Sequence, residues 1–394
     1  MHEANRMLRL PPYLFTVVDS LKREVRESGK EVIDFSMGNP DFDPPPHVVT
    51  EMRRALKIKH IHRYSKPDEE VEVNFRRAIG KWYQGRFGID FDPDKEILPL
   101  IGSKEGVAHL SLAFLNNDDL ALVPSPAYPV HFNGVIMAGG ILYNIPLKEE
   151  NGYLPDLQHI PRETTRLSKI MFLSYPHNPT AAVCDIEFFN KVVHWAKDKN
   201  MIVAHDLAYS DIVFGDKRAP SILEVKGAKK FCVEFHTLSK SYSMPGWRVG
   251  FAVGNKEILA SLNKTKSYVD FGLFRAVQMA ATAALTGPQG YVKKITKIYK
   301  KRVDYFVDAL NKMGWAVRKP EATFYVWAKI PEVYHAHSSM DFTELLLRET
   351  GVAVSPGTGF GECGEGYVRF ALVRSEPEME RALKRIKGFL EMKV

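Results

Sequence analysis

A lysine surrounded by hydroxyl side chains is the most reactive combination in the sequence. Lys240 lies in the stretch Thr237-Leu-Ser-Lys-Ser-Tyr-Ser-Met-Pro-Gly-Trp-Arg248, with an arginine eight residues after it. A lysine in a semi-polar pocket loses its proton more readily than a surface lysine, and the free amine suits Schiff-base chemistry. Because this stretch is poor in charge and rich in hydroxyls, it is not typical of a surface loop. We therefore expect Lys240 to act as a nucleophile.

Three other stretches place polar residues directly after apolar runs. Asp206 lies in residues 205–209 (His-Asp-Leu-Ala-Tyr), Asn178 in residues 174–180, and Ser103 at the start of a helical stretch. Open α/β sheets bind ligands at the carboxyl ends of their strands, and a helix N-terminus can hold a phosphate through its free amides. Each stretch also has an ordinary interpretation: Ser103 and Asp206 as helix caps, and Asn178 in a common Asn-Pro turn.

The elements that must position these residues alternate along the middle of the chain. Apolar runs at residues 119–124, 169–174, 201–205 and 230–235 predict short strands buried on both faces. Between two of these runs, residues 185–199 carry apolar side chains at helical spacing. The alternation predicts a largely parallel sheet in an α/β layer architecture.

The pattern changes after Pro288. Apolar residues recur every three or four positions from Val292 to Met313, and Gly314 ends the run, which predicts one long amphipathic helix. Strands are then predicted at residues 323–328 and 367–372, with a helix at 341–350 between them. This tail predicts a smaller α+β domain. It is too short to bury a large core alone, so we expect it to pack on the first domain.

The composition excludes several classes of protein. Of the 394 residues, 45% are hydrophobic and 26% are charged, which excludes a disordered polymer, a collagen-like fibre and a coiled-coil rod. The net charge of +7 is compatible with nucleic acid, an anionic membrane or small anionic ligands as partners. No apolar run is long enough for a membrane span, and the N-terminus has no apolar signal region. Three scattered cysteines favour a reducing compartment, so we expect a cytoplasmic location.

Five features, in the same order over nearly the whole chain, resemble the fold-type I pyridoxal-phosphate aminotransferases of class I/II. They are Asn178-Pro-Thr, Asp206 with Tyr209, Ser239-Lys240, Arg248 and Arg369. Six short stretches are similar in sequence to the bacterial glutamate–pyruvate (alanine) aminotransferase subgroup, which is itself close to the LL-diaminopimelate aminotransferases. They are residues 12–15, 34–41, 102–106, 205–209, 325–329 and 368–372.

The resemblance implies a particular α/β fold. A large domain with a three-layer, mostly parallel sheet would be joined to a smaller α+β domain. Residues 1–45 would join the small domain, residues 46–288 would form the large cofactor-binding domain, and residues 289–394 would form a long linking helix and the small C-terminal domain. A homodimer is also implied, in which Tyr64 reaches across to the partner's phosphate.

By the same resemblance the cofactor is pyridoxal 5′-phosphate. Lys240 would bond covalently to it and later move a proton, and Asp206 would face its ring nitrogen. Asn178 and Tyr209 would hydrogen-bond the ring hydroxyl, and Tyr128 would stack on the ring face. The phosphate would be held by Ser103, Lys104, Thr237, Ser239 and Arg248.

The implied substrates are amino acids and 2-oxo acids. Arg369 would bind the substrate α-carboxylate through two parallel bonds, with Gly38, Tyr13 and Asn178 beside it. This favours small anions over nucleic acid or a membrane as the partners. We expect ping-pong transamination between alanine/pyruvate and glutamate/2-oxoglutarate. An aminotransferase for aspartate, aromatic amino acids, methionine or LL-diaminopimelate, or a β-lyase on the same fold, remains the alternative.

Two segments depart from the family pattern. Residues 66–75 are longer and more acidic than the usual turn and contain no glycine, which weakens the prediction for Tyr64. Arg275 stands where a small residue is common. It is therefore either a ligand for the distal carboxylate of glutamate or a surface or interface arginine.

Two further patterns do not support a site. The glycine-rich residues 355–361 lack the strand-turn-helix context of a dinucleotide-binding loop. His335 and His337 have no third ligand at useful spacing, so no metal is expected.

Overall fold

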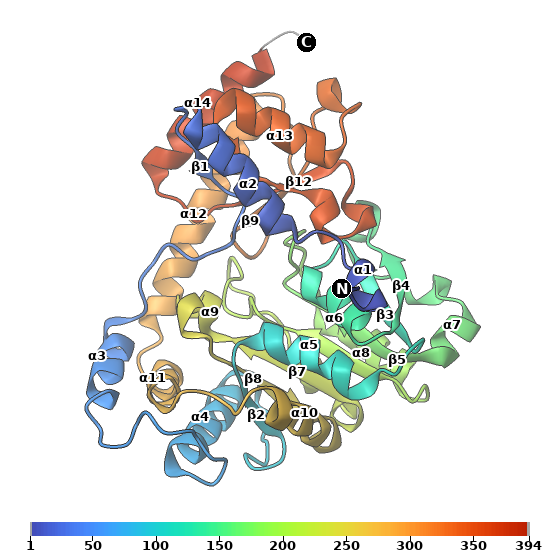
Figure 1. Cartoon of the computed structure of the whole chain (residues 1–394), viewed down its shortest axis with the longest axis vertical. Coiled ribbons are helices and arrows are strands. Elements are labelled where there is room, and N and C mark those ends of the chain that lie inside the picture. The colour runs from blue at the N-terminus through green and yellow to red at the C-terminus, as the bar shows by residue number, and fades with distance from the viewer. Residues whose placement is uncertain (1, 392–394) are drawn as a thin grey trace.

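The computed structural model describes residues 2–391, which are built around a seven-stranded sheet (Figure 1). The order across the sheet is β2-β8-β7-β6-β5-β3-β4. Only the two pairs that contain β8 are antiparallel, so the sheet is largely parallel, as the sequence predicts. The strands are β2 (Ile97–Leu100), β3 (Leu120–Ser125), β4 (Ile141–Pro146), β5 (Ser168–Leu173), β6 (Ile202–Asp206), β7 (Cys232–Thr237) and β8 (Gly250–Gly254).

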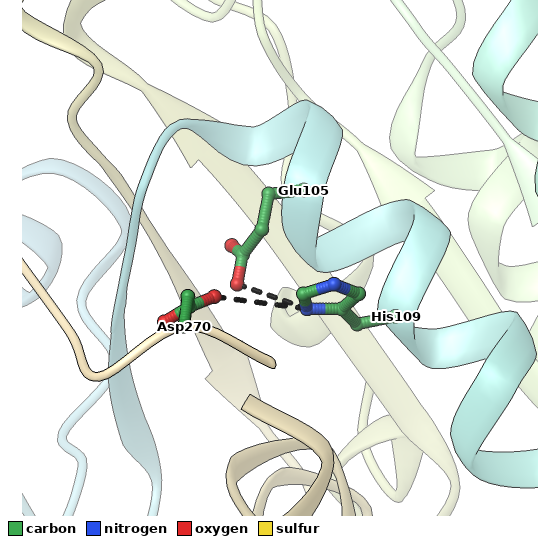
Figure 2. A group of neighbouring side chains, drawn as sticks. All are labelled: Glu105, His109 and Asp270. Atoms are coloured by element: carbon green, nitrogen blue, oxygen red, sulfur yellow. Dashed lines mark hydrogen bonds and ion pairs between the residues drawn. The ribbon is translucent and has the colours of Figure 1, made fainter. Parts of the chain in front are cut away.

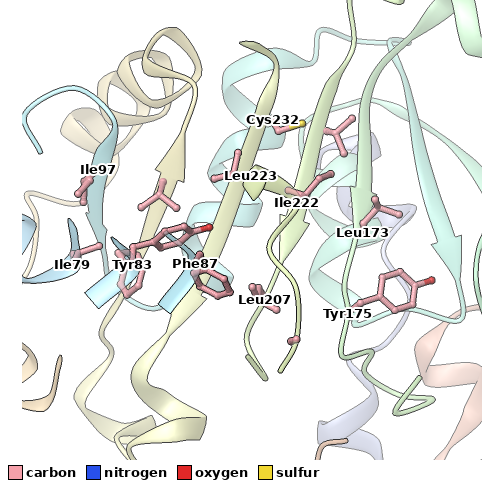
Figure 3. Close-up of a cluster of buried hydrophobic side chains, with 14 of the residues drawn as sticks. Ile79, Tyr83, Phe87, Ile97, Leu173, Tyr175, Leu207, Ile222, Leu223 and Cys232 are labelled. Atoms are coloured by element: carbon pink, nitrogen blue, oxygen red, sulfur yellow. The ribbon is translucent and has the colours of Figure 1, made fainter. Parts of the chain in front are cut away.

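Both faces of this sheet are covered. In β5, Met171 and Leu173 belong to one hydrophobic cluster, whereas Ile170 and Phe172 belong to another. Because successive side chains of a strand point to opposite faces, the two clusters lie on opposite sides of the sheet and make three layers. Figure 3 shows part of the first cluster, with Leu173 among its labelled side chains. The four apolar runs agree with β3, β5, β6 and β7, and the strand expected before Gly102 agrees with β2, whereas β4 and β8 were not predicted.

Helices form the outer layers. In α8, Asp185 accepts a hydrogen bond from the Phe188 amide at 2.8 Å and so begins the helix, and Val192 and Ala196 are buried one turn apart. The predicted helix at residues 185–199 is confirmed in this form. The helices of this part are α3 (Pro46–Ala55), α4 (Glu70–Phe87), α5 (Ser103–Phe114), α6 (Pro129–Met137), α7 (Arg162–Leu167), α8 (Ile186–Ala196), α9 (Leu238–Ser241), α10 (Lys256–Val269) and α11 (Arg275–Thr286).

The two ends of the chain come together in a smaller α+β part (Figure 1). Ile33 of β1 pairs with Val352 of β10, and both lie in a hydrophobic cluster with Phe306 of the long helix α12. The elements are α2 (Leu14–Glu27), β1 (Ile33–Asp34), α12 (Gly290–Lys312), β9 (Tyr325–Lys329), α13 (Ser339–Thr350), β10 (Val352–Ala353), β11 (Ser355–Pro356), β12 (Tyr367–Ala371) and α14 (Glu376–Glu391). The short helix α1 (Asn5–Leu8) lies instead against α6 of the larger part.

The predicted boundaries in this part shift by a few residues. The strand predicted from residue 323 begins only at Tyr325, because Thr323 has φ +64°, outside the β region. The helix predicted from residue 341 already begins at Ser339, because Ser338 caps it by accepting the Asp341 amide at 3.1 Å. Within residues 2–391, no helix has both the length and the apolar character needed to cross a bilayer.

The parallel strands deliver the predicted polar residues to one edge of the sheet. Asp206 is the last residue of β6, and Lys240 follows β7 in α9. Asn178 follows β5, the neighbour of β6. On β8, Gly250 allows a close approach: a Cβ there would lie 2.9 Å from the Ser103 amide nitrogen at the start of α5. The strand ends and the N-terminus of α5 therefore meet.

Candidate active site

A cavity of about 240 Å³ lies where these strand ends, the start of α5 and the small α+β part meet. Every residue predicted to bind cofactor or substrate lines it, with the exception of Tyr64. The lining residues are Tyr13, Phe15, Met37, Gly38, Asn39, Ser103, Lys104, Tyr128, Ser174, Asn178, Asp206, Ala208, Tyr209, Thr237, Ser239, Lys240, Pro245, Arg248, Tyr325 and Arg369.

Lys240 has an amine suited to nucleophilic chemistry at neutral pH. Its Nζ donates a hydrogen bond to the carbonyl oxygen of Gly38 at 2.7 Å. Burial, the largest cause, and the positive charges of Arg369 and Arg248 together lower the pKa of Lys240 to about 7, although the negative charge of Asp206 opposes them. Near neutral pH a large fraction of this amine is therefore uncharged.

Asp206 has one carboxylate oxygen engaged and one free. Oδ2 lies 3.3 Å from Nε2 of the buried His131, whereas Oδ1 is buried and has no hydrogen-bond partner within residues 2–391. The ring of His131 stacks on Phe172 of β5, with 5.7 Å between the ring centres. A buried carboxylate oxygen without a partner fits a protonated ring nitrogen of a ligand.

The hydroxyl groups of Tyr209 and Tyr325 meet in the cavity, close to Gly38. The Tyr209 and Tyr325 hydroxyl oxygens are 2.7 Å apart. Burial raises the pKa of Tyr209 well above its ordinary value, so its hydroxyl stays protonated and can donate a hydrogen bond. A Cβ at Gly38 would lie only 2.0 Å from the Tyr325 hydroxyl, so a larger residue there would displace Tyr325.

Arg369 is a buried cation with a defined orientation. Nη1 donates to Asn178 Oδ1 at 2.7 Å, and Nη2 donates to the Ser36 carbonyl oxygen at 2.8 Å. The guanidinium carbon lies 4.2 Å from the centre of the Tyr325 ring. Within residues 2–391 no carboxylate pairs with Arg369, so its charge is available to an anionic ligand.

The predicted phosphate ligands lie at the opposite end of the cavity. Ser103 begins α5, and the Thr237 and Ser239 hydroxyl oxygens are 2.9 Å apart. Arg248 is exposed, with φ +54°, and a Cβ at Gly102 would lie 2.7 Å from its Nη2. A helix N-terminus, two hydroxyls and a guanidinium together form a cup for a dianion.

Lys104 lies at the mouth of the cavity. Its Nζ donates to the Tyr13 hydroxyl at 3.2 Å and lies 5.8 Å from the centre of the Tyr128 ring. The structure therefore places Lys104 with both the predicted phosphate ligands and the predicted substrate residue Tyr13.

Tyr64 and Arg275 do not line the cavity. The Tyr64 side chain is 75% exposed, and its ring packs against Phe271 with 4.9 Å between the ring centres. Arg275 forms an ion pair with Glu69 and also donates to the Tyr64 carbonyl oxygen at 2.5 Å. Because Glu69 neutralises the guanidinium, the structure favours the surface or interface interpretation of Arg275. The acidic residues 66–75 provide this partner: Glu69 is the residue just before α4, which begins at Glu70.

Among the residues that sequence reasoning missed, His131 and Tyr325 make the hydrogen bonds to Asp206 and Tyr209 described above. His131 lies three residues after Tyr128, a spacing that places both side chains on one side of a helix, and this could have indicated it. Tyr325 belongs to a stretch that carried the resemblance, but its contact with Tyr209 depends on the packing of β9 against the segment that follows β6.

The comparison with known families decides the identity. A model of the family described as aminotransferase class I and II matches residues 30–386. The chain belongs to the class I and II aminotransferase family.

Individual aminotransferases are similar over almost their whole length. The LL-diaminopimelate aminotransferase of Desulforudis audaxviator is 45% identical over 388 residues, covering 98% of each chain. The glutamate-pyruvate aminotransferase AlaC of Escherichia coli is 47% identical over 383 residues, covering 97% of this chain and 92% of that one. The substrate-bound structure of BacF from Bacillus subtilis superposes with a TM-score of 0.94 at 36% identity, covering 99% and 98% of the two chains.

Aminotransferases of class I and II depend on pyridoxal phosphate, and this chain is a pyridoxal-phosphate-dependent aminotransferase of fold type I. Its substrates are amino acids and 2-oxo acids. The cavity fits the cofactor. Lys240 provides an amine with a lowered pKa, Asp206 a buried oxygen without a partner, and the start of α5 a cup for the phosphate.

Proposed function

We propose that this aminotransferase moves an amino group between an L-amino acid and a 2-oxo acid by a ping-pong mechanism centred on Lys240. The observation that carries this proposal is the convergence of Lys240, Asp206 and Arg369 on one cavity of about 240 Å³. Lys240 supplies an amine that is partly uncharged at neutral pH. Within residues 2–391, Asp206 has a carboxylate oxygen without a hydrogen-bond partner, and Arg369 has no carboxylate partner.

Each residue has a distinct task toward the cofactor in this proposal. When bound, pyridoxal phosphate supplies an electron sink for the carbanion formed at the substrate Cα. Asp206 keeps the ring nitrogen protonated, His131 orients Asp206, and Asn178 and Tyr209 hydrogen-bond the ring hydroxyl. Tyr128 covers the ring face. The phosphate is bound by Ser103, Lys104, Thr237, Ser239 and Arg248.

Proton transfer is the task of Lys240. Its Nζ would remove the proton from the substrate Cα and return it to the carbon on the other side of the transferred nitrogen. Arg369 binds the α-carboxylate of the same substrate, and Gly38 and Tyr13 close the cavity beside it. Since Arg369 and Lys240 come from different parts of the molecule, the substrate bridges the small α+β part and the large sheet.

We propose alanine/pyruvate with glutamate/2-oxoglutarate as the substrate pairs. Support comes from the AlaC relative, which is named a glutamate-pyruvate aminotransferase. LL-diaminopimelate is the second candidate, because relatives at comparable identity are named for it. Aspartate and aromatic aminotransferases of known structure are also similar, but at only 26–28% identity, so they support those alternatives less strongly.

A half-reaction screen tests this proposal. The holoenzyme is mixed with one amino acid at a time, and the loss of the visible band of lysine-bound cofactor is recorded. We expect alanine and glutamate to remove the band fastest, with LL-diaminopimelate as the informative competitor. Lys240→Ala is the control and should show no such band. A wild-type protein that binds no pyridoxal phosphate, or whose band no amino acid removes, would overturn the proposal.

We also propose a homodimer. The side chains of Tyr268, Val269, Phe271 and Phe274 are exposed around the α10–α11 loop, and the exposed Tyr64 packs against Phe271. An exposed apolar patch of this kind is typical of an interaction surface, and a second copy of the chain is the occupant we propose. We call these five side chains the aromatic patch.

The domain limits and the location remain proposals as well. We propose residues 46–288 as the large domain and residues 1–45 with 289–394 as the small domain, because β1 and α12 share one hydrophobic cluster. The odd number and wide spacing of the cysteines support a reducing compartment, and on that basis we propose a cytoplasmic location.

A further inference from the structure

Four ionisable side chains meet beside the first turn of α5, outside the residues that line the active-site cavity. Lys266 Nζ donates to Glu105 Oε1 at 2.5 Å and to the two oxygens of Asp270 at 2.9 and 3.0 Å. His109 Nδ1 lies 3.1 Å from the same Glu105 oxygen. Figure 2 shows Glu105, His109 and Asp270 pointing toward one another. We call these four side chains the α5 cluster.

The α5 cluster is not arranged for a metal ion. One ligand atom from each of Glu105, His109 and Asp270 lies within 4.8 Å of the others, a spacing that a cation could use. The ammonium group of Lys266 bonds to both carboxylates and therefore already occupies the cation's place. A metal ion would have to expel a side chain that is only 4% exposed.

The charges of the α5 cluster depend on one another. Lys266 contributes one positive charge against the two negative charges of Glu105 and Asp270. If Lys266 were removed, two largely buried carboxylates would face each other with only His109 to separate them. Breaking a buried ion pair by removing one partner leaves an uncompensated charge, and the structure relaxes to bring it to water.

Glu105 connects the α5 cluster to the proposed phosphate-binding residues. It lies in the first turn of α5, two residues after Ser103, which is one of those residues. Asp270 connects the α5 cluster to the α10–α11 loop, because its Oδ1 accepts a hydrogen bond from the Gly272 amide at 3.1 Å. This loop carries the aromatic patch. Lys266, on α10, thus joins the start of α5 to that loop.

We propose that Lys266 is a positioning residue for the cofactor phosphate: it holds the first turn of α5 in place through Glu105 and Asp270. The inference rests on the proposed position of the phosphate at the N-terminus of α5. Lys266 itself does not touch the cavity lining, so it acts through the direction of the α5 amides. Its loss should weaken the binding of phosphate-bearing ligands and leave the binding of the ring unchanged.

The test compares three ligands on apoprotein with and without Lys266→Met. Dissociation constants are measured for pyridoxal phosphate, for pyridoxal, which lacks the phosphate, and for inorganic phosphate as a competitor. We expect Lys266→Met to weaken pyridoxal phosphate and inorganic phosphate about tenfold or more, a change of about 1.4 kcal/mol. Pyridoxal should bind as it does to the wild type.

Two variants complete the test. Lys264→Met removes the same charge from an exposed position on α10 and should change none of the three constants. If Lys266→Met fails to fold, Lys266→Met with Asp270→Asn removes opposite charges together and serves for the same measurement. Equal weakening of pyridoxal and pyridoxal phosphate, or no weakening of either, would overturn the inference. Failure of the wild type to bind pyridoxal phosphate would instead overturn the proposed function.

Discussion

Lys240 and Arg369 share one cavity, and the charge of one alters the chemistry of the other. Burial is the main reason that the pKa of Lys240 falls to about 7, and the guanidinium of Arg369 is the next largest cause. Arg369 is itself held by Asn178 and Ser36 rather than by a carboxylate. A carboxylate substrate would neutralise Arg369 and so raise the pKa of Lys240 when it binds.

The lowered pKa predicts the pH dependence of cofactor capture. The uncharged amine is the reactive form, so the rate at which apoprotein captures pyridoxal phosphate should rise with pH and level off above about pH 7. Stopped-flow absorbance measures this rate. Arg369→Met removes a positive charge, so the midpoint of this rise in rate should move to higher pH. A wild-type rate that keeps rising toward pH 10 would show that the amine has an ordinary pKa.

Arg369 offers a second prediction at the same scale. Arg369→Lys keeps the charge but loses the planar fork, so it cannot bind a carboxylate and keep its bonds to Asn178 and Ser36. We expect kcat/KM for the amino acid to fall about a hundredfold, equivalent to about 2.7 kcal/mol, mainly through a higher KM. Steady-state kinetics give the two constants, and cofactor affinity is the control. An unchanged KM would contradict this role.

At the scale of elements, a buried carboxylate joins β6 to β7 just before the catalytic residues. Glu234 accepts hydrogen bonds from His205 on β6 at 2.8 Å and from His236 on β7 at 2.8 Å. Tyr83 of α4 donates to it at 2.6 Å. Because His205 directly precedes Asp206 in β6, this network fixes the strand end that carries the aspartate proposed to face the cofactor ring.

Glu234→Ala should therefore destabilise the protein strongly. Burial alone would raise the pKa of Glu234, but the bonds from His205 and His236 outweigh burial and hold the pKa well below its ordinary value. The stabilisation is present above the ordinary carboxyl pKa and is lost as the pH falls below it. At pH 7 we expect a loss of about 3 kcal/mol.

Calorimetry of the wild type and of the Glu234→Ala variant measures this loss of stability as a lower Tm of the variant. Glu163→Ala removes an exposed carboxylate paired only with Arg166 and should leave the Tm unchanged. If Glu234→Ala had the same Tm as the wild type, the hydrogen-bond network of Glu234 would not hold the strand ends.

At the scale of the whole molecule, the aromatic patch and the ion pair of Arg275 lie on the same surface. Arg275 bonds to Glu69 and to the Tyr64 carbonyl oxygen, and Tyr64 packs against Phe271. The two segments that depart from the family pattern, residues 66–75 and Arg275, therefore contact each other. They hold Tyr64 at the surface where the partner subunit is proposed to bind.

Phe271→Asp should break the proposed dimer. A charge in the middle of the aromatic patch would have to lose its water on association. We expect the variant to be monomeric at micromolar concentration in analytical ultracentrifugation, with reduced cofactor affinity and unchanged far-ultraviolet circular dichroism. Tyr305→Asp, an exposed aromatic side chain of α12, is the matched control and should leave the mass unchanged. A monomeric wild type would contradict the dimer directly.

Much of the fold was predictable because its signals are local. Apolar runs such as residues 169–174 mark strands buried on both faces, and the run from Val292 to Met313 marks the long helix α12. Strands β4 and β8 were missed. The outward positions of β4 are exposed, and β8 contains two glycines, so neither is a typical buried strand.

The sequence by itself determined which chemistry the site can perform, because Lys240, Asp206, Asn178 and Arg369 lie in short motifs beside their own strands. The tertiary structure alone decided which side chains meet across the chain. His131 reaches Asp206 over 75 residues of sequence, and Tyr325 reaches Tyr209 over 116. Such contacts depend on strand order and on how helices pack against the sheet, and no local pattern encodes them. The pKa of Lys240 has the same origin in part, since burial and the distant Arg369 are the two largest causes that lower it.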